Sequence, residues 1–208
     1  MSHNKYNDNL AKNIFEKLKY VVQFRTIKEN IMNIWKDITE KRITPEDFVV
    51  FIEIEQGSKN KYELDKETGL IILDRVLYTS THYPMNYGFI PLTLSQDNDP
   101  LDVFVLCSQP IEKGSLVRCF PIGVITMEDR DQLDEKVIAI PFGDPQYNSY
   151  SDISELPKHI LDELVHFLSV YKQLENKKVS ILNTGRRKEA VKCIKANMLA
   201  FKQMRGNL

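Results

Sequence analysis

The amino-acid sequence predicts an α+β protein with a mainly β core, a small barrel or sandwich that has helices at both ends. Short runs rich in β-branched and aromatic residues fill the middle of the chain, separated by Gly, Pro, Asp and Ser. Apolar residues recur at helical spacing before and after this region. The 208 residues, 42% hydrophobic and 27% charged, suit one folded domain with additions.

The first 44 residues are expected to form a helical extension, followed by a main domain over residues 45–208. Two apolar series have helical spacing: Leu10, Ile14, Leu18, Val21 and Val22, then Ile27, Ile31, Ile34, Trp35 and Ile38. They predict one long helix or a helical hairpin, packed against the domain or against another subunit. Binding to a membrane surface is the weaker alternative, because acidic residues dilute the positive charge that such binding uses.

The elements of the main domain are predicted from local patterns. Predicted strands cover residues 49–54, 61–64, 69–75, 101–106, 116–121, 123–127 and 137–140. The aromatic segment 83–91 also contains Pro and Gly, which predicts a rigid, partly buried loop. Amphipathic helices are predicted over residues 160–174 and 188–201.

The overall charge excludes some classes of partner. With 28 basic and 29 acidic side chains, the net charge of −1 provides no field to attract nucleic acid or an anionic membrane. Three cysteines without a close-spaced pair suggest neither a disulfide framework nor a zinc knuckle. No apolar run approaches the roughly 18 residues that span a bilayer, and the first residues do not resemble a signal peptide. A cytoplasmic protein with reduced thiols is therefore expected.

Three carboxylates crowd into a six-residue loop before an apolar run. Asp97, Asp99 and Asp102 surround Pro100, which restricts its own backbone and that of Asp99. Such a cluster repels itself unless cations compensate, and Mg²⁺ is bound by a few carboxylates together with water and phosphate. A solvated acidic turn is the structural alternative. An EF-hand is disfavoured, because Leu101 replaces an oxygen ligand and a strand follows.

Two further charged segments are ambiguous by themselves. Residues 128–136 form a second acidic cluster between predicted strands, which alone suggests an exposed hairpin loop. Lys61 and Glu63 lie on one face of a strand because side chains alternate along it, with Glu53 and Arg75 on neighbouring strands. That face either points to solvent or lines a cleft.

Taken in order, these segments resemble the family I soluble inorganic pyrophosphatases. The resemblance covers residues 45–174 and rests on Ile52-Glu53-Ile54, Asn60-Lys61-Tyr62-Glu63, Asp74-Arg75, Tyr83-Pro84-Met85-Asn86-Tyr87-Gly88, Asp97-Asn98-Asp99-Pro100-Leu101-Asp102-Val103 and residues 129–136. It implies an OB-like five-stranded barrel with flanking helices, and magnesium-dependent hydrolysis of pyrophosphate to two phosphates. It also implies a homo-oligomer, either a dimer or a hexamer.

The resemblance further implies a division of roles. Asp97, Asp102 and Asp134 match direct Mg²⁺ ligands, Asp129 a further ligand and Glu53 a ligand through water, while Asp99 matches the general base. Lys61, Arg75, Lys136, Tyr171, Lys172 and Tyr87 match the groups that hold the phosphates. Tyr171 also lies on the apolar stripe of its predicted helix, so a role in the core is an equal alternative. No covalent intermediate is required, because Mg²⁺ can activate a water for direct attack.

Some features depart from the family pattern and leave alternatives. Glu55-Gln56 stands where the family commonly has Pro, the helical extension has no counterpart in compact bacterial members, and the likeness fades after Leu174. An OB-like module that binds nucleic acid or oligosaccharide is one alternative, which the clustered carboxylates oppose. A catalytically silent interaction protein is another, and the intact set of matched residues argues against it.

Overall fold

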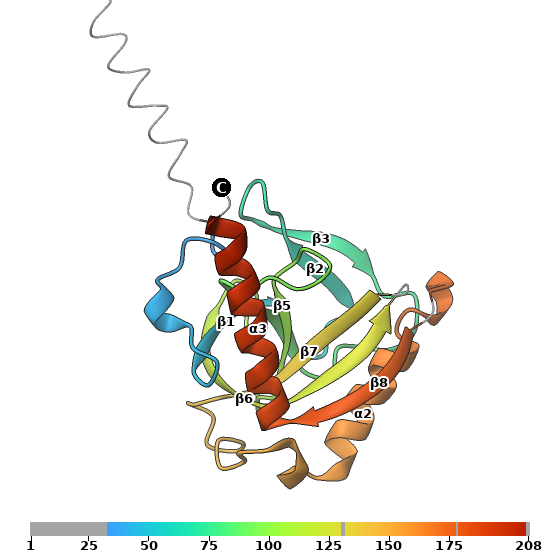
Figure 1. Ribbon diagram of the computed structural model, residues 1–208. Helices are drawn as coiled ribbons and strands as arrows, with labels where there is room; N and C mark the ends of the chain where they lie inside the picture. The colour runs from blue at the N-terminus through green and yellow to red at the C-terminus, as the bar shows by residue number, and fades with distance from the viewer. Residues whose placement is uncertain (1–32, 130–131, 178, 207–208) are drawn as a thin grey trace, which may run out of the picture. The chain divides into compact units, whose positions relative to one another are not determined.

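The structure is a computed structural model that describes residues 33–129, 132–177 and 179–206. Its centre is a six-stranded sheet (Figure 1). In sheet order the strands are β1 (Phe48–Ile54), β4 (Asn86–Ile90), β5 (Leu101–Val105), β7 (Gln132–Pro141), β6 (Leu116–Asp129) and β8 (Val179–Arg186). Because β1 also pairs with β6, the first five close into a ring and β8 adds to the outer edge of β6. The predicted fold class is confirmed.

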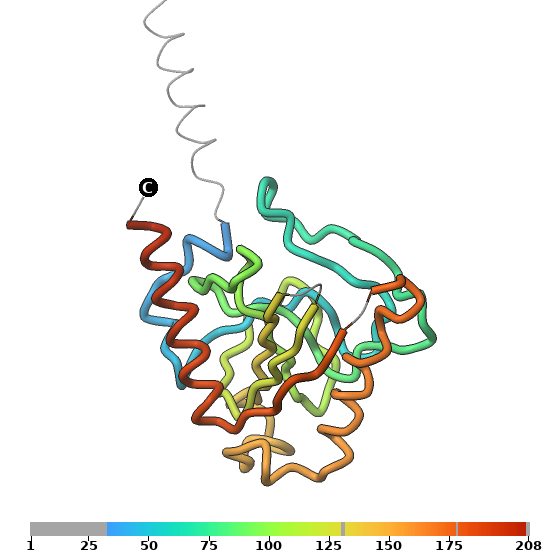
Figure 2. Tube along the Cα trace, turned by 45° about the vertical axis from the view of Figure 1, so that its right-hand side comes forward, coloured from blue at the N-terminus to red at the C-terminus, as the bar shows by residue number. Residues whose placement is uncertain are grey.

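A separate two-stranded sheet stands beside this ring. It consists of β2 (Asn60–Leu64) and β3 (Ile71–Val76), which pair antiparallel and project from the ring in both views (Figures 1 and 2). Gly69, at a φ of 72°, helps the chain turn between the two strands. The hairpin therefore forms a wall beside the ring rather than part of it.

The helices that pack against the sheet come from the C-terminal part of the chain. Helix α2 (Lys158–Val170) packs through Leu164, Phe167 and Leu168, and α3 (Arg187–Gly206) contacts β6, β7 and β8. The described residues also contain three 3₁₀ turns, η1 (Glu40–Arg42), η2 (Ile153–Glu155) and η3 (Gln173–Glu175). Within the described residues, no helix is long and apolar enough to cross a membrane.

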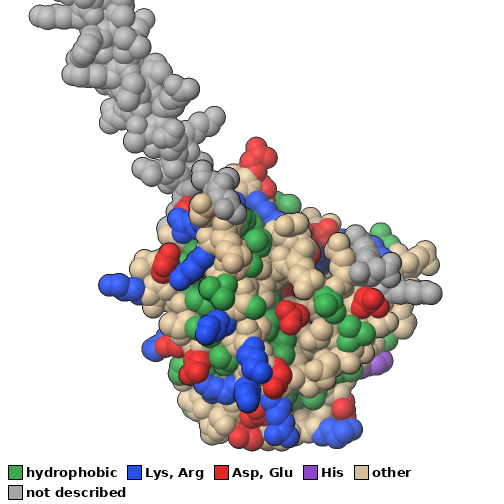
Figure 3. All heavy atoms as spheres, viewed as in Figure 1, with side chains coloured by type: hydrophobic (Ala, Val, Ile, Leu, Met, Phe, Trp, Pro, Cys, Tyr) green, Lys and Arg blue, Asp and Glu red, His purple; other side chains and the backbone are tan. Residues whose placement is uncertain are grey.

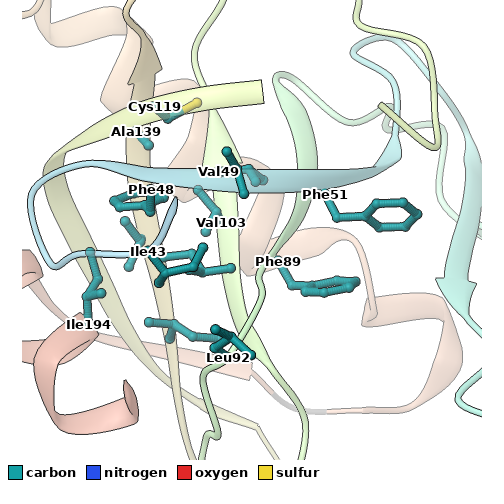
Figure 4. Close-up of a cluster of buried hydrophobic side chains, with 14 of the residues drawn as sticks. Ile43, Phe48, Val49, Phe51, Phe89, Leu92, Val103, Cys119, Ala139 and Ile194 are labelled. Atoms are coloured by element: carbon teal, nitrogen blue, oxygen red, sulfur yellow. The ribbon is translucent and has the colours of Figure 1, made fainter. Parts of the chain in front are cut away.

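Two apolar clusters form the core. All seven residues of β1 are buried, and Phe51 packs beside Phe89 of β4, with ring centres 5.4 Å apart (Figure 4). One cluster includes α3, and the other includes α2. On the face that carries α3, basic and acidic side chains are interspersed, as the near-zero net charge suggests (Figure 3).

The predicted elements need several corrections. The two strands predicted at 116–121 and 123–127 are one strand, β6, with a register shift between Pro121 and Gly123. The predicted aromatic loop contains β4, and β8 was not predicted. The described residues of the acidic segment, 128–129 and 132–136, belong to the paired strands β6 and β7 and not to a loop, although Glu128, Gln132 and Leu133 are exposed.

The helix predicted to reach Ile38 is also wrong in its described part, since residues 34–38 form turns; the remainder lies outside the described residues. Asn33 explains the change, because its side-chain oxygen accepts the N–H of Trp35 and its own N–H donates to Asp37. Trp35 is then buried, and its indole N–H donates to the carbonyl of Thr93 over 2.8 Å. The apolar residues Trp35 and Ile38, whose spacing predicted a helix, are thus buried in a turn instead.

Candidate active site

A polar cleft of about 470 Å³ brings all twelve predicted site residues together. It lies between the β5–β7 part of the ring, the β2–β3 hairpin and the segment after α2. The predicted residues that line it are Glu53, Lys61, Arg75, Tyr87, Asp97, Asp99, Asp102, Asp129, Asp134, Lys136, Tyr171 and Lys172. Segments far apart in the chain thus contribute to one cavity.

The floor of the cleft is built on the parallel pair β5 and β7. Their register places Asp102 directly beside Lys136. The Lys136 ammonium donates to Asp102 over 2.5 Å and to Asp134 over 2.8 Å. Asp134 reaches the same ammonium because residues two apart share one face of a strand. Lys136 is only 4% exposed, and the partly buried carboxylates of Asp102 and Asp134 hold its ammonium from the side of the cleft.

The acidic loop before β5 is ordered by its own hydrogen bonds. The N–H of Asp99 donates to the Asp97 carboxylate over 3.0 Å, and the N–H of Ser95 donates to the Asp99 carbonyl over 2.7 Å. Asn98 between them adopts a left-handed φ of 66°, which Asn tolerates better than most residues. The loop therefore presents two carboxylates in a fixed arrangement at the rim of the cleft.

Burial and repulsion between carboxylates raise the pKa values of Glu53, Asp97 and Asp134 in the cleft. Burial, followed by the nearby Asp102 carboxylate, raises the pKa of Glu53 to about 8. Burial also raises the pKa of Asp134, against the opposing effect of Lys136. Partial burial raises that of Asp97, and the neighbouring Asp102 and Asp99 add to the shift. The lysines thus compensate only part of the negative charge in the cleft.

The carboxylates suit a hard divalent cation. Asp129 accepts a hydrogen bond from Lys172 through one oxygen, over 2.6 Å, while its other oxygen is buried without a partner among the described residues. Oxygen donors of this kind are the ligands that Mg²⁺ prefers. Among the described residues no three His, Cys, Asp or Glu side chains form a metal-binding group. Mg²⁺ requires only a few carboxylates, because water and phosphate complete its coordination.

Basic residues of the hairpin face the cleft from another side. Lys61 of β2 and Arg75 of β3 lie directly opposite each other in the register of the two strands. Both contact Asp74, Lys61 over 3.2 Å and Arg75 over 2.5 Å, and Lys61 also pairs with Glu63. The face with Lys61 and Glu63 therefore lines the cleft, which was one of the two alternatives that the sequence left open.

The two predicted tyrosines combine packing with access to the cleft. Tyr87 is 8% exposed and packs on Phe104, and Tyr171 is 5% exposed and stacks on Phe167. Both nevertheless line the cleft. Burial, followed by the charge of Asp102, raises the pKa of Tyr87 well above its usual range, so its phenol keeps its proton. Tyr171 is therefore a core residue, which was one of the two alternatives, and its side chain also lines the cleft.

Several cleft residues were not predicted. Lys66, at the hairpin turn, forms an ion pair with Asp99 and lies 5.3 Å from the ring of Trp35. Trp35 and Lys177 also line the cleft. The turn signal Asp65-Lys66-Glu67-Thr68-Gly69 between two strands could have located Lys66 at the tip of the hairpin. The sequence held no comparable signal for Trp35 or Lys177.

Comparisons with known proteins agree with this geometry. A family model described as "Inorganic pyrophosphatase" matches residues 50–202. The chain is 46% identical over 164 residues to soluble inorganic pyrophosphatase 1 of Arabidopsis thaliana, and the match covers 79% of this chain and 77% of that protein. It is 44% identical over 172 residues to inorganic pyrophosphatase of Aquifex pyrophilus, covering 81% and 97% of the two chains.

Solved structures resemble the fold as well. The inorganic pyrophosphatase of Helicobacter pylori has a TM-score of 0.74 at 42% identity, and the match covers 76% of this chain and 95% of that one. The enzyme of Thermus thermophilus has a TM-score of 0.78 at 36% identity, and the match covers 82% and 99%.

Proposed function

We propose that this chain, which belongs to the inorganic pyrophosphatase family, hydrolyses pyrophosphate to two phosphates by direct attack of water. The observation that carries the proposal is the composition of the cleft, where carboxylates suited to metal ions lie beside a set of cations suited to phosphate. A non-catalytic module that only bound an anion would gain nothing from so many carboxylates, because they would repel its ligand.

The cofactor in this proposal is Mg²⁺. Asp97, Asp102 and Asp134 would hold it directly, Asp129 would add a further ligand, and Glu53 would act through water. The buried oxygen of Asp129 that has no partner among the described residues supports the assignment. When bound, Mg²⁺ neutralises phosphate charge and lowers the pKa of a coordinated water toward neutrality.

Asp99 acts as the general base in this mechanism. Its side chain is half exposed at the rim of the cleft, where water can reach it, and its backbone is held by the bond to Asp97. An ionised carboxylate in that place accepts the proton of the attacking water. Lys66, which pairs with this carboxylate, keeps it oriented until the substrate enters.

The cations and tyrosines hold the two phosphate groups. Lys61 and Arg75 act from the hairpin, while Lys136 and Lys172 act from the ring and the segment after α2. Their charges stabilise the negative charge that grows on the departing phosphate. The phenols of Tyr87 and Tyr171 donate hydrogen bonds to phosphate oxygens. No side chain forms a bond to phosphorus.

The test is the release of phosphate from pyrophosphate, measured with Mg²⁺ and with excess EDTA. We expect rapid release with Mg²⁺ and a loss of at least about 100-fold in EDTA. A protein that bound pyrophosphate without releasing phosphate under either condition would support the binding-module alternative instead.

We also propose that the chain works as a homo-oligomer, a dimer or a hexamer, in the cytoplasm. The resemblance to the family supports this assembly, and light scattering of the purified full chain distinguishes the two forms from a 24.2 kDa monomer.

A further inference from the structure

Glu175 carries a buried carboxylate beside the cleft. The proposed function assigns no role to this carboxylate. It belongs to η3, and its side chain is only 6% exposed. One carboxylate oxygen accepts the Nε–H of Arg75 over 2.9 Å, and the other accepts from the ammonium of Lys177 over 2.7 Å. Both of these cations line the cleft, whereas Glu175 does not. Glu175 thus stands behind two basic groups of the site.

The guanidinium of Arg75 is held at two of its three nitrogens. Its Nε donates to Glu175 and its Nη1 donates to Asp74 over 2.5 Å. Its Nη2 is buried and has no partner within the described part of the chain. A buried donor without a partner costs free energy, and a planar guanidinium fixed at two positions presents the remaining donor in one direction. Glu175, together with Asp74, therefore fixes the direction in which Nη2 of Arg75 points.

The contact also joins two parts of the fold. Arg75 belongs to the β2–β3 hairpin, which is a separate sheet. Glu175 lies 100 positions after Arg75 in the chain, in the segment that follows α2. The same segment after α2 carries Tyr171 and Lys172 into the cleft. After Glu175, Asn176 adopts a left-handed φ of 55° and the chain turns, so that Lys177 reaches the second oxygen.

The carboxylate is ionised at neutral pH. Burial raises the pKa of Glu175, but hydrogen bonds from Lys177 and Arg75 lower it by more, so the net shift is downward. The negative charge needed to hold both cations is therefore present.

We propose that Glu175 is a positioning residue, which orients Arg75 and Lys177 toward the phosphate groups of the substrate. The inference rests on the proposed function of the cleft. Glu175 contacts no reacting atom itself, and its effect passes through the two cations that it holds.

Glu175→Gln tests the proposal, because it keeps the shape of the side chain but removes its charge and one of its two acceptors. We expect KM for pyrophosphate, at fixed excess Mg²⁺, to rise about tenfold. The Kd of inorganic phosphate, measured by calorimetry, should rise similarly. Glu155→Gln is the matched control, since Glu155 also lies in a 3₁₀ turn and accepts two hydrogen bonds, both from Ser151, outside the cleft. It should leave both constants unchanged.

A double-mutant cycle separates positioning from a general loss of structure. In an Arg75→Met background, Glu175→Gln should raise the Kd of phosphate by clearly less than it does in the wild-type chain, because only the route through Lys177 remains. Full additivity, or a Glu175→Gln variant with wild-type KM and Kd, would overturn the proposal.

If the wild-type chain releases no phosphate from pyrophosphate, the proposed function fails while the calorimetric comparison still tests Glu175. A wild-type chain that does not bind phosphate at all would overturn both.

Discussion

At the scale of single residues, the cleft combines buried charged groups that also belong to the core with exposed charged groups that do not. Lys136 is buried between Asp102 and Asp134, and these carboxylates raise its pKa although burial alone would lower it. Lys136 therefore keeps its positive charge in the folded protein. Asp99 is half exposed and touches little of the core, so its substitution tests chemistry with little effect on folding.

Asp99→Asn should fold normally and lose most turnover. The amide keeps the size of the side chain and leaves the backbone bond to Asp97 intact, but it cannot accept a proton from water. We expect kcat to fall about 10²–10⁴-fold, with a melting temperature within about 2 °C of wild type. Asp162→Asn is the control, because it removes another exposed Lys–Asp pair, on α2 and away from the cleft. Near-normal phosphate release by Asp99→Asn would contradict its assignment as the base.

Asp144 shows a structural role for a carboxylate far from the chemistry. It is 4% exposed and accepts the N–H groups of Ser108 and Gln146 over 2.6 and 2.9 Å. Burial raises the pKa of Asp144, but these N–H groups lower it by more, so its pKa lies below the usual range. A carboxylate with a lowered pKa stabilises the fold above its unfolded pKa and loses this contribution as pH falls through the folded pKa.

Asp144→Asn should therefore destabilise the protein in a pH-dependent way. We expect its free energy of unfolding in urea to be about 1–3 kcal/mol lower than that of wild type between pH 5 and 8. The difference should narrow as pH falls below about 4, where the carboxylate of the unfolded chain gains its proton, toward the lower pKa of the folded state. A difference that stayed constant down to pH 3 would mean that charge plays no part in this contact.

At the scale of elements, the sequence predicted strands best where β-branched residues ran without interruption. β1 and β5 were predicted to within one residue at each end, and the C-terminal half of β7 was predicted, whereas Pro84 and Gly88 made the β4 region resemble a loop. Gly88 is in fact required by the pairing of β4 with β1. A Cβ atom at this position would overlap the backbone carbonyl group of Phe51.

Gly88→Ala should consequently disrupt the ring of strands. The added methyl group meets backbone rather than a flexible side chain, so β1 and β4 must separate. We expect a loss of at least about 3 kcal/mol in the free energy of unfolding, or failure to fold. Gly143→Ala is the matched control, because no atom lies within 4 Å of the place that its methyl group would take, and it should change stability by less than about 1 kcal/mol. A well-folded Gly88→Ala would show that the two strands have room to move.

At the scale of the whole molecule, a net charge of −1 conceals a concentration of acidic and basic side chains in one cleft. The residues of the cleft could be predicted individually because motifs and family resemblance are local in sequence. Their mutual contacts could not, since the parallel register of Asp102 with Lys136 and the bond of Arg75 to Glu175 depend on how distant segments pack. Long-range pairing of this kind leaves no periodic signal in the chain.

The crowded carboxylates should make the stability of the metal-free molecule depend on pH. Because the pKa of Glu53 is raised to about 8, the folded state binds a proton there that the unfolded state has lost, and stability falls as pH rises from about 4.5 to about 8. In EDTA, Glu53→Gln should remove this contribution, on the order of 3 kcal/mol, while its amide oxygen still accepts the N–H of Leu64.

Mg²⁺ should restore wild-type stability at pH 8 by binding the folded state, and it should stabilise Glu53→Gln less. Thermal melting at pH 5 and pH 8, with EDTA and with Mg²⁺, measures both effects, with Asp162→Asn as a control that should follow wild type throughout. Equal Mg²⁺ shifts in wild type and Glu53→Gln would remove Glu53 from the metal site and leave its buried charge without a function.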